Sequence, residues 1–150
     1  MCSGTGPGCI AGGLSRENSD CPEYQDRNHY PDALRGRSIL VVEDEPLIAM
    51  DISLAFEQVG ALVTTTHTLK HALVMVENDG LHAAILDHAL GDQDSTILCE
   101  RLTQRGIPYL IYSGFRKLKG ACHAGAHVSK PATGAVLVAT MEALLRQKGD

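Results

Sequence analysis

Apolar runs in this sequence end in side chains that could bind a cation or take part in phosphoryl transfer: Glu43, Asp44, Glu45, Asp87, Ser113 and Lys130. Carboxylate oxygens are hard ligands and suit Mg²⁺, which keeps several waters and takes one or two carboxylates. A carboxylate can also attack phosphorus and form an acyl phosphate. A hydroxyl and an ammonium can bind the oxygens of a transferring phosphoryl group. The six residues therefore point to one kind of site, provided that the fold brings them together.

The three acids at 43–45 directly follow the apolar run Ile39–Val42. Such a run is typical of a buried strand, and burying three acids would be very costly, so we expect the strand to end before them. Two like charges ~4 Å apart repel by roughly 4 kcal/mol at an effective dielectric near 20, so a cation would stabilise the cluster. The alternative is an exposed acidic turn before a helix N-terminus, where the helix dipole also favours acids.

The residue types suggest a role for each side chain. We predict that Asp44 and Asp87 bind Mg²⁺ directly and that Glu43 acts through a water molecule. Mg²⁺ and Lys130 would each neutralise an oxygen of the phosphoryl group, and the Ser113 hydroxyl with nearby backbone N–H groups would bind the rest. His67 and His71 have helical i, i+4 spacing but lack a neighbouring acid or cysteine pair, so we predict that they are surface residues.

The elements that must position these residues alternate regularly from Gly36 onward. Strands are predicted at 39–42, 61–66, 82–87, 107–112 and 126–129, and helices at 46–59, 68–77, 94–105, 115–124 and 135–147. Leu47, Met50, Leu54 and Val59 give the first helix an apolar stripe of the kind that faces a protein core. Asp94 or Ser95 can cap the third helix.

Five strand–helix units imply an α/β fold, a doubly wound parallel sheet with helices on both faces. The carboxyl ends of all parallel strands lie at one edge, where ligands bind in open α/β sheets. Residues 36–150 are predicted to form this domain. Residues 1–35 are rich in Gly, Pro and polar residues and lack apolar periodicity, so we expect a disordered N-terminal extension.

Composition excludes several classes of protein. The 150-residue chain has a net charge of −5, which argues against nucleic acid as the main partner. Neither a membrane span nor a secretory signal is predicted. Five cysteines, at positions 2, 9, 21, 99 and 122, lack CxxC spacing, so a zinc site or disulfide framework is not expected, and the cytoplasm is the expected compartment.

The combination resembles the receiver domain of two-component response regulators over residues 37–150. The resemblance rests on four motifs in order: Val-Val-Glu43-Asp44-Glu45-Pro, Ile-Leu-Asp87, Tyr-Ser113-Gly114 and Ser-Lys130-Pro131. It implies a flavodoxin-like sheet of order 2-1-3-4-5, with Asp87 as phosphoacceptor and Ser113 as the switch hydroxyl. It also implies that Lys130 contacts the phosphoryl group, and that Glu43, Asp44 and the backbone carbonyl of Ala89 contribute to the Mg²⁺ site.

The sequence departs from the family pattern at several positions. Glu43 stands where Asp is common, and His127 stands where an aromatic switch residue is usual, which puts the usual coupling to the outer face in question. The segment after Asp87 lacks the usual Pro, so a more mobile loop is expected. Gly114 after the switch hydroxyl resembles a subgroup of stand-alone receivers, and a single-domain regulator without a fused output domain is expected.

The predicted function is a signalling switch that accepts a phosphoryl group from a sensor histidine kinase or phosphotransfer protein and then changes its binding to an unknown downstream protein. It would not be a metabolic enzyme, and its expected catalysis is slow self-dephosphorylation. The alternative is a phosphorylation-independent pseudo-receiver that acts as a binding module. A Mg²⁺ phosphohydrolase is disfavoured because Asp-x-Asp is missing, and a nucleotide-binding protein because phosphate-loop motifs are missing.

Overall fold

The structure is a computed structural model that describes residues 33–90, 93–114 and 124–149. Residues 1–32 of the predicted N-terminal extension and residues 115–123 of the predicted helix at 115–124 lie outside these ranges. Leu34, which we assigned to the extension, is fully buried with Ile39 and Phe56 in the core. The compact unit accordingly begins at Ala33, slightly earlier than predicted.

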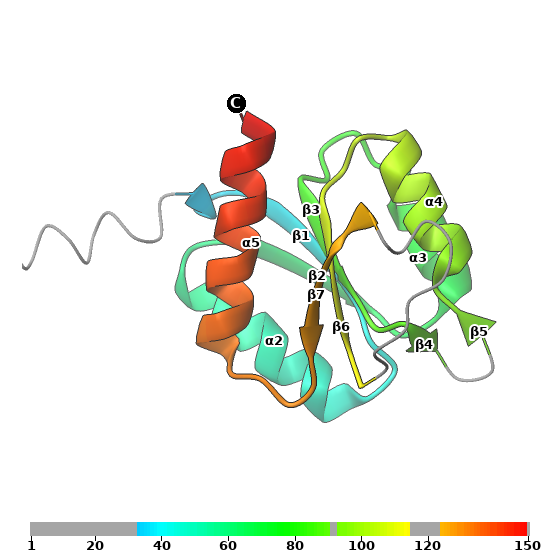
Figure 1. The fold of residues 1–150 in the computed structure, drawn as a ribbon, viewed down its shortest axis with the longest axis horizontal. Coiled ribbons are helices and arrows are strands. Elements are labelled where there is room, and N and C mark those ends of the chain that lie inside the picture. Colours follow the sequence, from blue (N-terminus) through cyan, green and yellow to red (C-terminus); the bar gives the residue numbers. More distant parts are fainter. Residues whose placement is uncertain (1–32, 91–92, 115–123, 150) are drawn as a thin grey trace, which may run out of the picture. The chain divides into compact units, whose positions relative to one another are not determined.

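Five parallel strands form the main sheet in the order β2-β1-β3-β6-β7 (Figure 1). Their bounds are β1 Ser38–Val42, β2 Leu62–Thr66, β3 Ala83–Leu86, β6 Tyr109–Ser113 and β7 Ala126–Ser129. Counted along the chain within this sheet, the order is 2-1-3-4-5, and every neighbouring pair is parallel. The predicted doubly wound, flavodoxin-like fold is confirmed.

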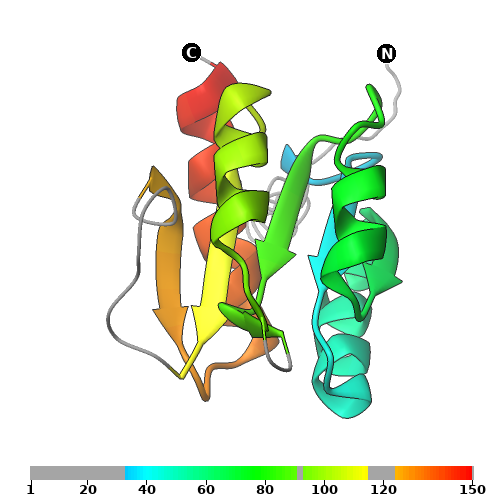
Figure 2. The ribbon, with the colours of Figure 1, turned by 90° about the vertical axis from the view of Figure 1, so that its right-hand side faces the viewer.

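Helices cover both faces of the sheet (Figures 1 and 2). α2 (Pro46–Gln58) and α5 (Gly134–Gly149) lie on one face, and α3 (Leu69–Met75) and α4 (Thr96–Gln104) lie on the other. Gly60 and Gly106, which we expected to end helices, have φ of +91° and +70°, a left-handed conformation that glycine adopts without strain. Among the described residues, every helix is too short or too polar to span a bilayer.

Strand side chains alternate between two hydrophobic cores. Leu40, Val42 and Leu86 point into the core that α3 and α4 cover. Val41 and Ile85 point into the core that α2 and α5 cover. Because both faces of each central strand are buried, the strands read as continuous apolar runs, which is why β1 and β3 could be recognised in the sequence.

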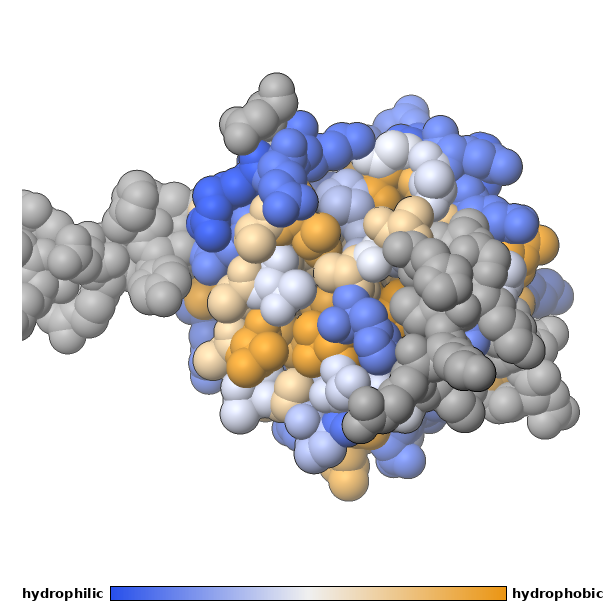
Figure 3. All heavy atoms as spheres, in the orientation of Figure 1, coloured by the Kyte–Doolittle hydropathy of each residue, from blue (hydrophilic) through white to orange (hydrophobic). Residues whose placement is uncertain are grey.

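Most of the apolar stripe predicted for the first helix is not its buried face, although Val59 at its end packs partly buried against the core. Leu47, Met50 and Leu54 are 69%, 55% and 51% exposed, whereas Ile52 and Phe56 are buried. The helix carries apolar residues on more than one side, so helical periodicity alone could not tell which stripe faces the sheet. Figure 3 shows apolar surface where α2 and the lower end of α5 lie.

The segment after Asp87 contains two short strands that the sequence did not predict. β4 (Ala89–Leu90) pairs antiparallel with β5 (Gln93–Asp94), and residues 91–92 between them lie outside the described ranges. α4 follows this pair, and its Cys99 is buried in the core.

Candidate functional site

Asp87 lies at the carboxyl end of β3, the middle strand of the sheet, and its backbone is fixed on both sides. Its N–H donates to the Val42 carbonyl at 3.0 Å, and its carbonyl accepts a hydrogen bond from the Ser95 hydroxyl. The residue is 8% exposed. Ser95 is the N-cap residue of α4, one of the two caps predicted, but its side chain makes no helix-cap hydrogen bond. No sequence pattern indicated its contact with Asp87, because this contact exists only after β3 and α4 pack.

Three carboxylates converge at this edge of the sheet. Ligand oxygens of Glu43, Asp44 and Asp87 all lie within 4.8 Å of one another. Asp44 is exposed, as the sequence predicts for an acid after a strand, but Glu43 is only 4% exposed. Glu45 is exposed and lies outside this cluster. β1 therefore ends before the three acids, as predicted, but the cost of burying an acid did not keep Glu43 at the surface.

Lys130, the residue after β7, contacts this cluster through its ammonium group. Its Nζ lies 3.1 Å from Asp87 Oδ2 and 3.2 Å from Glu43 Oε1. Its backbone N–H donates to the Ser113 carbonyl at 3.1 Å, and a cis peptide bond joins it to Pro131. One ammonium therefore contacts two of the three clustered acids, which compensates the burial of Glu43.

The compensation is incomplete, as the pKa of Glu43 shows. Burial and the charge of Asp87 raise this pKa from 4.5 to about 7, although Lys130 and the backbone N–H of Glu45 act in the opposite direction. Burial lowers the pKa of Lys130, but its hydrogen bonds and charge interactions with Asp87 and Glu43 outweigh that effect and raise it. Burial is the larger of the two causes that raise the pKa of Glu43, so the interior around it disfavours its charged form.

These residues fit a divalent cation. The donors are carboxylate oxygens, which Mg²⁺ prefers, and their spacing lets Asp44 and Asp87 contact one ion while Glu43 stays near it. A cation would also favour the ionised form of Glu43, which burial and the charge of Asp87 disfavour. The chemistry of the donor set therefore agrees with the predicted Mg²⁺ site.

The other predicted residues lie at different places in the fold. Ser113 is the fully buried last residue of β6. Ala89 opens β4, two residues after Asp87. His127 is half-buried in the edge strand β7, opposite Ile111, and its buried Nε2 has no hydrogen-bond partner among the residues that the structure describes. The structure brings together four of the predicted residues: Glu43, Asp44, Asp87 and Lys130. The roles assigned to Ser113, Ala89 and His127 stay predictions.

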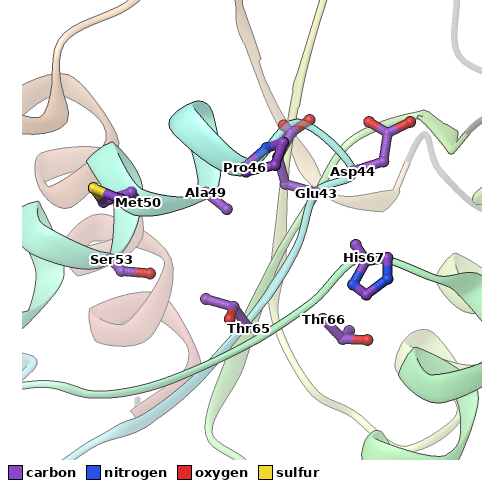
Figure 4. A pocket seen from close by; sticks show the side chains of 9 residues that line it. All are labelled: Glu43, Asp44, Pro46, Ala49, Met50, Ser53, Thr65, Thr66 and His67. Carbon is purple, nitrogen blue, oxygen red and sulfur yellow. The ribbon is translucent and has the colours of Figure 1, made fainter.

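A cavity of about 490 Å³ adjoins the acidic cluster (Figure 4). Glu43 and Asp44 border it at one end, Ala49 and Ser53 of α2 form a side, and the end of β2 with exposed His67 closes it. His67 and His71 are both exposed, as predicted. The cavity lies beside the carboxylates on the side that neither Asp87 nor Lys130 lines.

Tyr112 is a further neighbour of the site that the sequence analysis missed. Its ring centroid lies 5.5 Å from Lys130 Nζ. An aromatic residue in a buried strand ordinarily signals core packing, so nothing in the pattern distinguished it.

Comparisons with known proteins agree on one family. The profile of the response regulator receiver domain matches residues 39–142. The chain is 33% identical over 117 residues to the transcriptional regulatory protein CseB of Streptomyces coelicolor, covering 74% of this chain and 50% of CseB, so it spans about half the length of that relative. It is 37% identical to SdrG of Sphingomonas melonis Fr1, with a TM-score of 0.64 over 75% of this chain and 98% of SdrG. A CheY-like receiver domain protein from Methanospirillum hungatei JF-1 is 24% identical, with a TM-score of 0.69 over 76% of this chain and 97% of that one, and shares the fold.

Proposed function

Because this chain belongs to the response regulator receiver domain family, we propose that it is a phosphoryl-accepting signalling switch with Asp87 as the acceptor. One observation carries the proposal: a single ammonium, Lys130 Nζ, bridges Asp87 at 3.1 Å and Glu43 at 3.2 Å inside a cluster of three carboxylates. This arrangement is suited to a nucleophilic carboxylate beside a cation that receives the phosphoryl oxygens.

In the proposed reaction an Asp87 carboxylate oxygen attacks the phosphorus of a phosphohistidine on a sensor kinase or phosphotransfer protein. A P–O bond forms on Asp87 as the P–N bond to the imidazole breaks, and the imidazole leaves with that electron pair. Bound Mg²⁺ would neutralise phosphoryl oxygens. Asp44 and Asp87 would bind the ion directly. Glu43 would bind it through a water molecule, and the backbone carbonyl of Ala89 would be a further ligand.

Lys130 and Ser113 would bind the remaining phosphoryl oxygens. Lys130 already lies within hydrogen-bond distance of Asp87, so it needs little movement to contact a group attached there. Ser113 carries its hydroxyl at the end of β6, next to β3 in the sheet. The added charge on Asp87 would draw this end of β6 inward and change the face that partners recognise.

Several finer features of the function are part of the proposal. We place the protein in the cytoplasm, with a histidine kinase or phosphotransfer protein upstream and a protein target downstream. Its chemistry would be single phosphoryl acceptance and slow self-dephosphorylation, without turnover of a metabolite. CseB is described as a transcriptional regulatory protein, and the present proposal is confined to the receiver switch.

The test is phosphorylation by a small acyl phosphate with Mg²⁺, followed by intact-protein mass spectrometry. We expect a gain of one phosphoryl group in the wild type, none in Asp87→Ala, and normal labelling in Asp51→Ala, which removes an exposed acid of α2. Equal labelling of Asp87→Ala would refute the proposed acceptor.

His127 favours a second candidate, a receiver-like binding module that does not use phosphate. Its ring replaces the usual aromatic switch residue, and its Nε2 is buried without a hydrogen-bond partner among the described residues. This candidate predicts partner binding that Asp87→Asn leaves unchanged and wild-type protein that takes up no phosphoryl group.

A further inference from the structure

We propose that Tyr112 is a positioning residue for Lys130: its hydroxyl anchors the β7–α5 connection that carries Lys130, and its ring faces the ammonium. This inference rests on the proposed function, because the ammonium matters for activity only if Asp87 accepts a phosphoryl group. Tyr112 lies in β6, one residue before Ser113, and its side chain packs on the face of the sheet that α2 and α5 cover.

The hydroxyl of Tyr112 makes two hydrogen bonds to one residue. It accepts from the Ala132 backbone N–H at 3.0 Å and donates to the Ala132 carbonyl at 3.2 Å. Ala132 lies two residues after Lys130 in the connection between β7 and α5. A phenol can fill both roles, donor and acceptor, whereas phenylalanine can fill neither. The hydroxyl therefore ties this connection to the central part of the sheet.

The ring of Tyr112 faces the ammonium of Lys130. Lys130 Nζ lies 5.5 Å from the ring centroid, within the range in which an ammonium is attracted to an aromatic face. The Tyr112 residue is 7% exposed, so water screens this attraction less than at an open surface. Tyr112 thus acts on Lys130 in two ways, through the connection that follows it and through its charged group.

This contact differs in kind from the other contacts of the ammonium. Glu43 and Asp87 also hold Lys130, but both belong to the cluster whose charge would change when a cation binds or when Asp87 is phosphorylated. Tyr112 is uncharged and lies outside the cluster. It can hold Lys130 in the same place before and after the reaction, which is the preorganisation that transition-state stabilisation requires.

Two variants separate the hydroxyl from the ring. Tyr112→Phe removes only the bonds to Ala132, and we expect phosphorylation by a small acyl phosphate to slow by about threefold to tenfold, the effect of one or two buried hydrogen bonds. Tyr112→Leu also removes the aromatic face and is expected to slow it by about a further tenfold. The dissociation constant for Mg²⁺, measured by calorimetry, is expected to stay within about twofold because Tyr112 is not one of the clustered carboxylates.

Tyr109 provides a matched control in the same strand. It is buried, and its hydroxyl lies 3.3 Å from the Thr103 hydroxyl on the opposite face of the sheet. Tyr109→Phe therefore removes a buried phenol hydroxyl from β6 without touching the Lys130 connection. We expect its phosphorylation rate to stay within about twofold of the wild type.

A second measurement does not depend on phosphorylation. In the protein without any phosphodonor, the reactivity of the Lys130 amine toward acetic anhydride is followed by peptide mass spectrometry, with exposed Lys70 as the internal reference. We expect Lys130 to react faster in Tyr112→Phe and faster still in Tyr112→Leu, and to react as in the wild type in Tyr109→Phe.

The outcomes separate the two proposals. If the wild type takes up no phosphoryl group but Lys130 reactivity rises in the Tyr112 variants, the proposed function fails and the positioning of Lys130 stands. If Tyr112→Phe matches the wild type in rate and reactivity, the positioning role is refuted. It is also refuted if Tyr109→Phe slows phosphorylation as much, or if the rate falls while Lys130 reactivity is unchanged.

Discussion

Glu43 is an acid whose surroundings disfavour its ionised form. In the folded protein its pKa is about 7, against 4.5 for an exposed glutamate, because it is buried beside Asp87. The folded state therefore binds a proton more tightly than the unfolded state. The stability that Glu43 contributes is complete below about pH 4.5 and is lost as the pH rises toward 7.

Glu43→Gln should remove the loss of stability at high pH, because glutamine stays uncharged. In EDTA near pH 8 we expect the variant to be more stable than the wild type by about 1–2 kcal/mol, with a smaller difference near pH 5. Urea unfolding at the two pH values measures both. Glu45→Gln, a change at the exposed neighbour, should leave stability unaltered. A wild type that is equally stable at both pH values, with no gain in Glu43→Gln, would contradict the assigned burial.

The buried hydroxyls of Ser95 and Ser53 should contribute differently to the free energy of unfolding. The Ser95 hydroxyl donates to the Asp87 carbonyl, whereas Ser53 Oγ has no hydrogen-bond partner among the described residues. Ser95→Ala should cost about 1–2 kcal/mol of unfolding free energy because it leaves a buried carbonyl short of a donor. Ser53→Ala should be neutral or slightly stabilising. Equal effects in chemical denaturation would argue against the Ser95 contact.

At the scale of elements, α2 shows how a helix can carry two apolar stripes and bury one. Leu54 and Phe56 lie two residues apart on this helix, and their exposed fractions are 51% and 0%. Phe56→Ala should destabilise the fold by about 3–5 kcal/mol because it opens a cavity between α2 and the sheet. Leu54→Ala should change stability by less than about 0.5 kcal/mol. Thermal unfolding of the two variants decides the orientation, and comparable losses would show that the assigned face is wrong.

The strands were readable in the sequence, and so was the extent of α2, although not the face that it buries. Val41, Val42, Ile85 and Leu86 form uninterrupted apolar runs because both faces of a central strand are buried. Glycine with positive φ marked the ends of α2 and α4. The short β4–β5 pair carried no such signal, since two-residue strands depend on their partner for definition.

At the scale of the whole molecule, ion binding and folding should be linked, because the acidic cluster forms only when β1 and β3 lie side by side. Mg²⁺ at about ten times its dissociation constant should raise the unfolding free energy by about 1.4 kcal/mol. Asp44→Asn should abolish this gain, and Asp51→Asn should keep it. The midpoint of thermal unfolding in a Mg²⁺ titration measures the effect. An increase that persists in Asp44→Asn would place the ion elsewhere.

The sequence by itself determined the succession of strands and helices, the parallel sheet and the edge at which Asp44, Asp87, Ser113 and Lys130 gather. These features follow from local patterns, since apolar runs define strands and parallel strands share one carboxyl edge. It also placed the four motifs in the order typical of the family.

Only the tertiary structure decided which acid is buried, which stripe of α2 faces the sheet, and that Ser95 and Tyr112 support Asp87 and Lys130. Each of these outcomes depends on contacts between residues far apart in the chain, such as Glu43 with Lys130 or Ser95 with the end of β3. Local periodicity records how often apolar residues recur, but it contains no information about which distant side chain will lie opposite a given one, and that pairing sets the burial and charge of the site.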